Sequence, residues 1–389
     1  MVLKIVYKPG KKQIYAEDQS TIDILRSGYF GELREHKLFL LPEEALFIMD
    51  VRNAECFDTD GNKMLFNDLA SVYVPQKKFM ARYFTYKDWR DRGLIIKEAD
   101  FEFKQKEEYK TPIKSYPMSS FSLKSYKMEG IFFPDDLTTV VGNSEDSKRI
   151  YNEGWFGQYG TYKVENHGGL NKLDVFETLF LIHEGVLDVK NYQRSEIMGV
   201  SKKRRADFTK LYDVYSDWRS KGYIIKTGFK FGTHFRIYFP GAKPQKSENT
   251  WIHSHHVLHV FPRDVKMLTS EWARVIRVAH SVRKTFILAI PGKSRKKKVP
   301  IDFILFHRKN GNIEQPGSES PRFAMLSLSE NEYIGGSELS AIINGAKNRK
   351  LELIIAIADR ETAVTYYKVR RIGLPKSEYE YYEIDWLQP

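Results

Sequence analysis

The sequence predicts a mixed α/β (α+β) protein made of repeated units, and three observations predict it. The chain has 389 residues, of which 42% are hydrophobic and 14% aromatic, so it is too long for one core and apolar enough to fill several. Apolar residues alternate in some short segments and recur at helical spacing in others. A twelve-residue motif occurs twice, which indicates that a small α/β domain has been duplicated.

The duplicated motif lies in the N-terminal two thirds of the chain. Residues 86–97 (YKDWRDRGLIIK) return as residues 215–226 (YSDWRSKGYIIK), with eight of twelve positions identical at an offset of 129. Upstream, a GYFG segment at 28–31 is echoed by GWFG at 154–157, and the order of the motifs is kept. Chance is a poor explanation for this agreement, so we interpret the two segments as copies of one domain.

Each copy is predicted to contain two amphipathic helices followed by a buried strand. The second helix spans residues 79–89 in one copy and 208–218 in the other, and a glycine follows each helix as a C-terminal cap should. A run of apolar residues after that glycine starts the strand. The predicted boundaries are 1–104 for the first copy, 105–124 for a linker rich in Lys, Glu, Ser and Pro, and 125–227 for the second copy.

A fainter repeat follows the two copies. Residues 270–276 align with 337–343 at an offset of 67, which predicts a module at 228–310, a linker at 311–321 and a second module at 322–389. At this offset His253 meets Ser320 and Lys284 meets Leu351, whereas Tyr238 is expected to have no counterpart. The second module therefore keeps the fold pattern without the reactive side chains of the first.

Composition limits the partners and the compartment. The net charge of +12 favours a polyanion such as nucleic acid, although a basic surface alone would also account for it. The single cysteine excludes an intrachain disulfide and a Cys-rich zinc site, and no apolar run approaches the ~20 residues that span a bilayer. We expect a cytoplasmic protein without a cofactor. The histidines around His253 lack nearby acidic or thiol ligands, so no metal site is predicted.

Three reactive side chains, Tyr238, His253 and Lys284, lie in separate segments of the first module. Each fits an ordinary structural role, but the second module folds without His253 and Lys284. When RNA is cleaved by its own 2′-hydroxyl group, a base takes the 2′ proton, an acid protonates the leaving 5′ oxygen and a cation offsets charge on the phosphorus oxygens. Histidine and lysine suit two of these roles, and tyrosine serves as the base if nearby cations lower its pKa. DNA lacks the attacking hydroxyl.

The segments around these residues resemble the signature of archaeal tRNA-splicing endonucleases. The resemblance is carried by residues 222–238 (GYIIKTGFKFGTHFRIY), by His253-Ser254 with His259-Val260, and by residues 277–284 (RVAHSVRK), and it covers roughly residues 140–290. It implies two restriction-endonuclease-like nuclease halves, one catalytic and one degenerate, and cleavage of precursor tRNA at bulge–helix–bulge junctions. The expected products carry 2′,3′-cyclic phosphate and 5′-hydroxyl ends.

The resemblance also implies roles for individual residues and an assembly. Tyr238 would be the general base, His253 the general acid and Lys284 the cation that stabilises the transition state. Arg277 matches an arginine that stacks on a bulged base, and Arg308 is the nearest match for its partner. The basic insert at 291–298, with Lys296 and Lys297, is expected to contact the RNA backbone. One active site per chain and two cleavage sites per substrate predict a homodimer.

Two other readings stay open on the sequence alone. A structure-selective DNA nuclease would need paired acidic metal ligands with a nearby lysine, and the closest acids, Asp264 and Glu271, do not form that pattern. A non-catalytic RNA-binding subunit would not need the three reactive side chains. Acidic residues near Glu314, Glu319, Glu330 and Glu332 are expected to be exposed and to dock on a basic surface of another unit.

Overall fold

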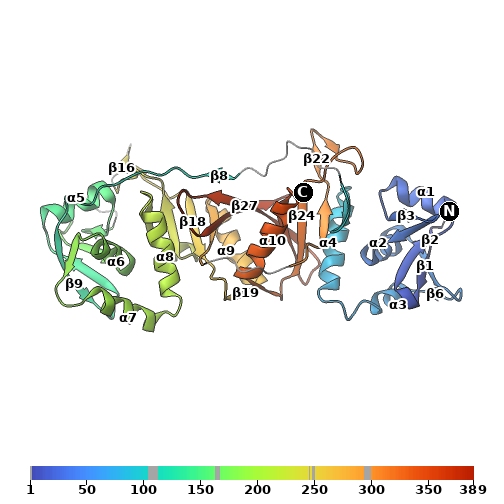
Figure 1. Cartoon of the computed structure of the whole chain (residues 1–389), viewed down its shortest axis with the longest axis horizontal. Coiled ribbons are helices and arrows are strands. Elements are labelled where there is room, and N and C mark those ends of the chain that lie inside the picture. The colour runs from blue at the N-terminus through green and yellow to red at the C-terminus, as the bar shows by residue number, and fades with distance from the viewer. Residues whose placement is uncertain (1, 104–112, 163–166, 245, 248–249, 293–298) are drawn as a thin grey trace.

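The computed structural model describes residues 2–103, 113–162, 167–244, 246–247, 250–292 and 299–389. The molecule is elongated: the two copies of the N-terminal domain lie at opposite ends, and a long central sheet joins them (Figure 1). Helices and strands mix throughout, so the predicted α/β class is confirmed. None of the helices in these ranges is long and apolar enough to cross a membrane.

The first copy forms a six-stranded sheet with strand order β3-β4-β2-β1-β5-β6. Helix α4, predicted at 79–89, spans Phe79–Asp91 and ends next to Gly93, which has a φ of 75°. The elements in chain order are β1 (Lys4–Lys8), η1 (Pro9–Lys11), β2 (Gln13–Ala16), α1 (Gln19–Ser27), β3 (Glu32–Arg34), β4 (Lys37–Leu40), α2 (Pro42–Arg52), β5 (Glu55–Asp58), β6 (Lys63–Met64), α3 (Phe66–Ser71) and α4.

The second copy forms a five-stranded sheet with strand order β11-β12-β10-β9-β13. Its helix α8 spans Phe208–Arg219, again as the repeated motif predicts. Helix α5, capped by the Ser144 hydroxyl, precedes the GWFG turn and was not predicted. The elements are β9 (Met128–Phe133), β10 (Thr138–Val141), α5 (Glu145–Gly154), β11 (Gln158–Tyr159), β12 (Asn171–Asp174), α6 (Val175–His183), β13 (Leu187–Val189), α7 (Arg194–Arg204) and α8.

An eleven-stranded sheet runs through the middle of the molecule in the order β14-β15-β18-β20-β28-β27-β26-β24-β21-β7, with β8 paired to β27 off this path. Two parallel pairs, β18 with β20 and β24 with β26, are each connected by a crossover helix. The elements are β7 (Ile96–Glu98), β8 (Lys114–Ser115), β14 (Ile224–Thr227), η2 (Phe229–Phe231), β15 (Phe235–Tyr238), β18 (His256–Val260), α9 (Thr269–Ser281), β20 (Thr285–Ile290), β21 (Phe303–Leu305), β24 (Phe323–Ser329), α10 (Gly336–Asn348), β26 (Glu352–Ala358), β27 (Val364–Gly373) and β28 (Glu380–Leu387).

Short two-stranded ribbons complete the described elements. Strand β19 pairs with β25 and thereby ties the start of α9 to the start of α10. The ribbons are β16 (Lys246–Ser247) with β17 (Thr250–Trp251), β19 (Lys266–Leu268) with β25 (Tyr333–Gly335), and β22 (Arg308–Lys309) with β23 (Asn312–Ile313).

The strand pairing corrects the expectation that Tyr238 has no counterpart. Strand β7 of the first copy pairs with β21, just as β14 of the second copy pairs with β15. Tyr238 pairs with Ile224, and the backbone N–H of Phe306 donates to the carbonyl of Ile95, which the 129-residue offset aligns with Ile224. Phe306 therefore occupies the position of Tyr238 and lacks its hydroxyl. Sequence comparison missed the match because β7 and β21 lie roughly 200 residues apart.

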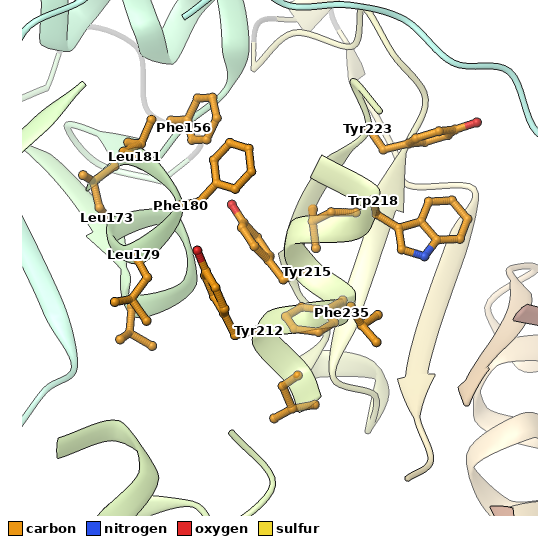
Figure 2. Packing of buried hydrophobic residues seen from close by; sticks show 14 of the residues in the cluster. Phe156, Leu173, Leu179, Phe180, Leu181, Tyr212, Tyr215, Trp218, Tyr223 and Phe235 are labelled. Atoms are coloured by element: carbon orange, nitrogen blue, oxygen red, sulfur yellow. The ribbon is translucent and has the colours of Figure 1, made fainter. Parts of the chain in front are cut away.

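Three hydrophobic cores follow the same division of the chain. One joins the second copy to β15, β18 and β20, and Figure 2 shows its aromatic centre, where Phe180, Tyr215 and Phe235 lie between α6 and the sheet. A second joins the first copy to β21, β24 and β26. The third lies on the face of the central sheet that α9 and α10 cover. Each N-terminal copy thus shares a core with one half of the central sheet, and burial of apolar area at about 25 cal/mol per Å² holds the pair together.

The second half of the predicted linker is docked on the molecule. Strand β8 pairs with the end of β27, and Tyr116 and Leu123 are buried. We call this docked segment, residues 113–124, the strap; it runs from the end of β27 to the second copy (Figure 1). Residues 104–112 lie outside the described part of the chain.

Candidate active site

Tyr238 lies at the end of β15 with its ring buried against the second copy. The ring centroids of Tyr238 and Trp155 are 4.7 Å apart, and only 4% of Tyr238 is exposed. Trp155 caps α5 with a φ of 49°. The sequence contains Trp155 within the repeated GWFG turn, but no pattern indicated that it packs on Tyr238.

A buried ion pair fixes that turn to the strand next to Tyr238. Lys226, in β14, donates to Glu177 at 2.5 Å and to the carbonyl of Gly157 at 2.8 Å. Glu177 also accepts from the backbone N–H of Gly157. The first copy repeats the two contacts to glycine: Lys97 donates to the carbonyl of Gly31, and the N–H of Gly31 donates to Glu44.

Arg236 is the charged neighbour of Tyr238 on the same strand. Its guanidinium carbon lies 5.8 Å from the centre of the Tyr238 ring. Burial raises the pKa of Tyr238, and the positive charge of Arg236 opposes that shift. Burial is the larger of the two effects, so the pKa of Tyr238 lies above its ordinary value in the free protein. Among the described residues, the buried Nε atom of Arg236 has no hydrogen-bond partner.

Lys284 lies between α9 and β20, and its backbone N–H donates to the carbonyl of Ala279. Its Nζ atom donates to the carbonyl of Ser254 and lies 5.1 Å from the centre of the Phe231 ring. Partial burial lowers the pKa of Lys284, and the charge of Arg236 lowers it further. One arginine therefore acts on both Tyr238 and Lys284.

His253 is exposed in the segment before β18, one residue before the carbonyl that Lys284 holds. The contact between Lys284 and Ser254 thus brings the segments of His253 and Lys284 together, and Arg236 connects them to Tyr238. His256, two residues beyond Ser254, begins β18 and is buried. The three segments singled out in the sequence thus meet at one place, where the side chain of His253 is exposed and that of Lys284 is partly buried.

An exposed aromatic ring lies beside this site. Phe229, at the start of η2, is 87% exposed. Its turn is rigid: the N–H of Phe231 donates to the carbonyl of Gly228 at 2.8 Å, and a Cβ on Gly228 would meet Thr233 at 2.4 Å. Phe231, two residues on, contacts Lys284. Both phenylalanines alternate with polar neighbours in the sequence, a pattern typical of a strand, but they lie in the short helix η2.

The residues expected to contact RNA are spread out. Arg277 is exposed on α9. Arg308 lies in β22 beside the first copy and donates to the carbonyl of Arg92 at 2.8 Å. Lys296 and Lys297 lie outside the described residues. No three His, Cys, Asp or Glu side chains gather closely enough to hold a metal ion in the parts of the chain that the structure describes.

The acidic residues near the C-terminal half do not form an exposed group. Glu314 is buried, pairs with Arg322 at 2.8 Å and accepts from the backbone N–H of His307. The expectation of an exposed Glu314 is therefore wrong, because an arginine in the same loop satisfies it locally. Glu332 is partly buried and accepts from the N–H of Ser329.

Comparison with known proteins decides the family. The tRNA intron endonuclease N-terminal domain matches residues 135–201, and the tRNA intron endonuclease catalytic C-terminal domain matches residues 208–301. A tRNA-splicing endonuclease from Hyperthermus butylicus is 32% identical over 177 residues, which cover 43% of this chain and 92% of that relative. The chain belongs to the tRNA-splicing endonuclease family.

Longer tRNA-splicing endonucleases match most of the chain. The one from Methanococcoides burtonii is 25% identical over 342 residues, covering 72% of this chain and 94% of that relative. The one from Methanosarcina barkeri is 23% identical over 339 residues, covering 72% and 93%. This tRNA-splicing endonuclease family member is an RNA endonuclease, and Tyr238, His253 and Lys284 all fall within the segment that matches the catalytic domain.

Proposed function

We propose that the protein excises introns from precursor tRNA by cutting bulge–helix–bulge junctions without a metal ion. In the proposed step, the 2′ oxygen forms a bond to the adjacent phosphorus while the bond from phosphorus to the 5′ oxygen breaks. The products carry 2′,3′-cyclic phosphate and 5′-hydroxyl ends. The observation that carries the proposal is the meeting of Tyr238, His253 and Lys284 in a chain of this family.

Tyr238 is the proposed general base and His253 the proposed general acid. A tyrosine with a raised pKa is a strong proton acceptor once deprotonated, and the cation of Arg236 favours that deprotonated form. His253 is exposed and can reach a leaving oxygen outside the protein surface. Lys284 supplies the fixed positive charge toward the phosphorus oxygens, and its hydrogen bond to Ser254 holds the ammonium group in place.

We propose that precursor tRNA is also held by exposed cations and an exposed ring. Arg277 stacks on a bulged base, and Phe229 offers a second stacking surface beside Lys284. Lys296 and Lys297 contact the RNA backbone. Arg308 lies in the other half of the chain, so in our proposal it serves the active site of a second chain.

The proposed assembly is a homodimer with two active sites and four nuclease-like halves. In each chain, one restriction-endonuclease-like half is catalytic and the other is degenerate, and each half is completed by one copy of the N-terminal domain. The equivalence of Phe306 with Tyr238, of Ser320 with His253 and of Leu351 with Lys284 supports one active site per chain. Two sites related by a twofold axis suit a substrate with two cleavage points.

One assay tests the reaction. The protein is incubated with a bulge–helix–bulge RNA in EDTA, in parallel with Tyr238→Phe, His253→Ala and Lys284→Ala. We expect the unmodified protein to cut both junctions and each variant to lose about 10²–10⁴-fold in rate. A 2′-deoxy nucleotide at the scissile position should block cutting, because the nucleophile is gone. Absence of cleavage in EDTA with recovery in Mg²⁺ would overturn the proposal.

A further inference from the structure

The docked strap carries a tyrosine that contacts residues at the end of β15 and at the start of β18, on the face of the sheet opposite to Tyr238. Tyr116 follows β8 directly and is 1% exposed. Its ring stacks on Phe239, the residue after Tyr238, with centroids 6.2 Å apart and planes at 19°. The same ring meets the imidazole of His256 edge-on at 5.6 Å. One side chain from the strap thus contacts residues next to Tyr238 and at the start of β18.

The hydroxyl group of Tyr116 ties the same place to the C-terminal half. It donates to the carboxylate of Glu383, in β28, at 2.5 Å, and it lies 2.9 Å from Nε2 of His256. A carboxylate only accepts, so the tyrosine O–H donates to Glu383, and the His256 Nε2–H donates to the tyrosine oxygen. Burial lowers the pKa of His256 to about 4, which keeps the ring neutral in this arrangement.

The contacts lie on the side of the sheet opposite to Tyr238. His256 pairs with Ile237, whose side chain belongs to the core beneath α8, and consecutive strand residues point to opposite faces. Tyr238 therefore points away from His256 and Tyr116. Glu383 is itself 2% exposed and is also bound by Lys114 at 2.6 Å. Tyr116 touches no reacting group, so any effect on catalysis passes through the strands.

We propose that Tyr116 is a positioning residue of the active site. It fixes the position of the end of β15 relative to the start of β18. In this way it positions Tyr238 relative to the segment of His253 and Ser254, to which Lys284 donates a hydrogen bond. Through Glu383 it also connects this geometry to the C-terminal half of the chain. The proposal rests on the proposed cleavage reaction where rate is the readout.

The first test compares two buried tyrosine hydroxyls of the same region. Tyr116→Phe removes the hydrogen bonds to His256 and Glu383, whereas Tyr223→Phe removes a bond of 2.6 Å to the carbonyl of Pro117 in the same strap. We expect Tyr116→Phe to lower kcat about tenfold at unchanged KM. A misplaced Tyr238 would lose transition-state stabilisation equal to about the free energy of one hydrogen bond. Tyr223→Phe should stay within about twofold. Equal losses in the two variants, or no loss in Tyr116→Phe, would overturn the proposal.

A second test does not depend on cleavage. Amide hydrogen exchange of the peptide over 252–260 reports how firmly the start of β18 is held. We expect faster exchange there in Tyr116→Phe and in Glu383→Ala, and exchange like the parent's in Tyr223→Phe and in Glu383→Gln, whose amide oxygen still accepts from Tyr116. Unchanged exchange in Tyr116→Phe would refute the positioning role of Tyr116 even if the enzyme is active. Faster exchange in Tyr116→Phe, together with a parent that cuts no RNA, would instead remove only the proposed function.

Discussion

At the scale of single residues, Arg236 sets the electrostatics of the proposed site. It acts on Tyr238 and Lys284 together, favouring the deprotonated form of one and the neutral form of the other. The effect on Tyr238 favours the proposed reaction, because the tyrosine must lose its proton. The effect on Lys284 disfavours it in the free protein, because the lysine must stay protonated. A bound phosphate adds negative charge between the cations and favours the charged lysine.

The general acid can be separated from the general base by changing the leaving group. With a 5′-bridging phosphorothiolate RNA, sulfur departs without being protonated, so His253→Ala should cut this substrate within about threefold of the parent's rate. Tyr238→Phe should stay at least about 100-fold slower on both substrates, because the 2′ proton must still be removed. Rates of single-turnover cleavage measure both effects. Rescue of Tyr238→Phe, or no rescue of His253→Ala, would reverse the assigned roles.

Phe229 is expected to contribute to binding and little to the chemical step. Its exposed ring can stack on an unpaired base, which is worth about 1–3 kcal/mol, so Phe229→Ala should raise the Kd for a 2′-deoxy substrate about 5- to 150-fold. Phe229→Trp should bind like the parent. Val74→Ala is the matched control, since Val74 is 78% exposed on the first copy. Equal Kd values for Phe229→Ala and Val74→Ala would rule out the stacking role.

At the scale of elements, β18 carries a buried histidine, His256, and a partly buried one, His259, and protonation of either opposes folding. Burial lowers the pKa of His256 to about 4 and that of His259 to about 4. Because these folded-state values lie below the ordinary histidine pKa of about 6.5, the unfolded chain binds protons first as the pH falls. The stability present above pH 6.5 is therefore lost between about pH 6.5 and pH 4.

The size of this acid effect can be measured on one histidine. When the pH falls from 7.5 to 5.5, proton binding to each of these histidines in the unfolded chain lowers the free energy of unfolding by about 1.4 kcal/mol. His259→Gln removes one of the two, so the parent should lose about 1.4 kcal/mol more than the variant between these pH values. Urea unfolding at both values gives the difference. Identical pH dependence of the parent and of His259→Gln would contradict the neutral state of His259 in the folded protein.

Sequence periodicity predicted the elements well where the signal was local. Helices α4 and α8 begin where the repeated motif places them, because apolar spacing and a capping glycine are written within one segment. The pairing of β7 with β21 has no local signature, and Phe306 was therefore missed as the counterpart of Tyr238. Tyr116 was missed for a related reason: a single tyrosine in a charged segment shows nothing of the sheet on which it docks.

The site was likewise predicted only where the sequence carries a local signal. The reactive side chains stood out because a similar module occurs without them. Trp155 and Arg236 did not, since their importance depends on which strand end they face in space. The buried state of Glu314 also depends on a partner, Arg322, that a charge count cannot supply.

At the scale of the whole molecule, the two halves of the central sheet have the same construction. Each half contains a parallel strand pair with a crossover helix, completed by an N-terminal copy that shares its core. The sheet continues from one half to the other where β20 pairs with β28 and β28 with β27. One chain thus contains two halves of similar construction side by side.

The proposed homodimer has a direct physical measure. Light scattering should give twice the 45.6 kDa of one chain at the concentrations used for cleavage. A mixture of Tyr238→Phe and His253→Ala chains should recover no activity, because each site takes all three reactive groups from one chain. A monomer mass in an active preparation would contradict the counting of sites, and recovery in the mixture would show that a site is shared between chains.

The pairing of β7 with β21 also governs how the protein is made. Roughly 200 residues separate these strands in the sequence. At about 5–20 residues per second, a ribosome needs about 10–40 s to synthesise the residues between them. Strands β14 and β15 are neighbours in the sequence, so the second copy and the catalytic half can complete their core as they emerge. The first copy must wait for the C-terminal half with apolar surface uncovered. During translation, the first copy is thus expected to depend on chaperones more than the second copy does.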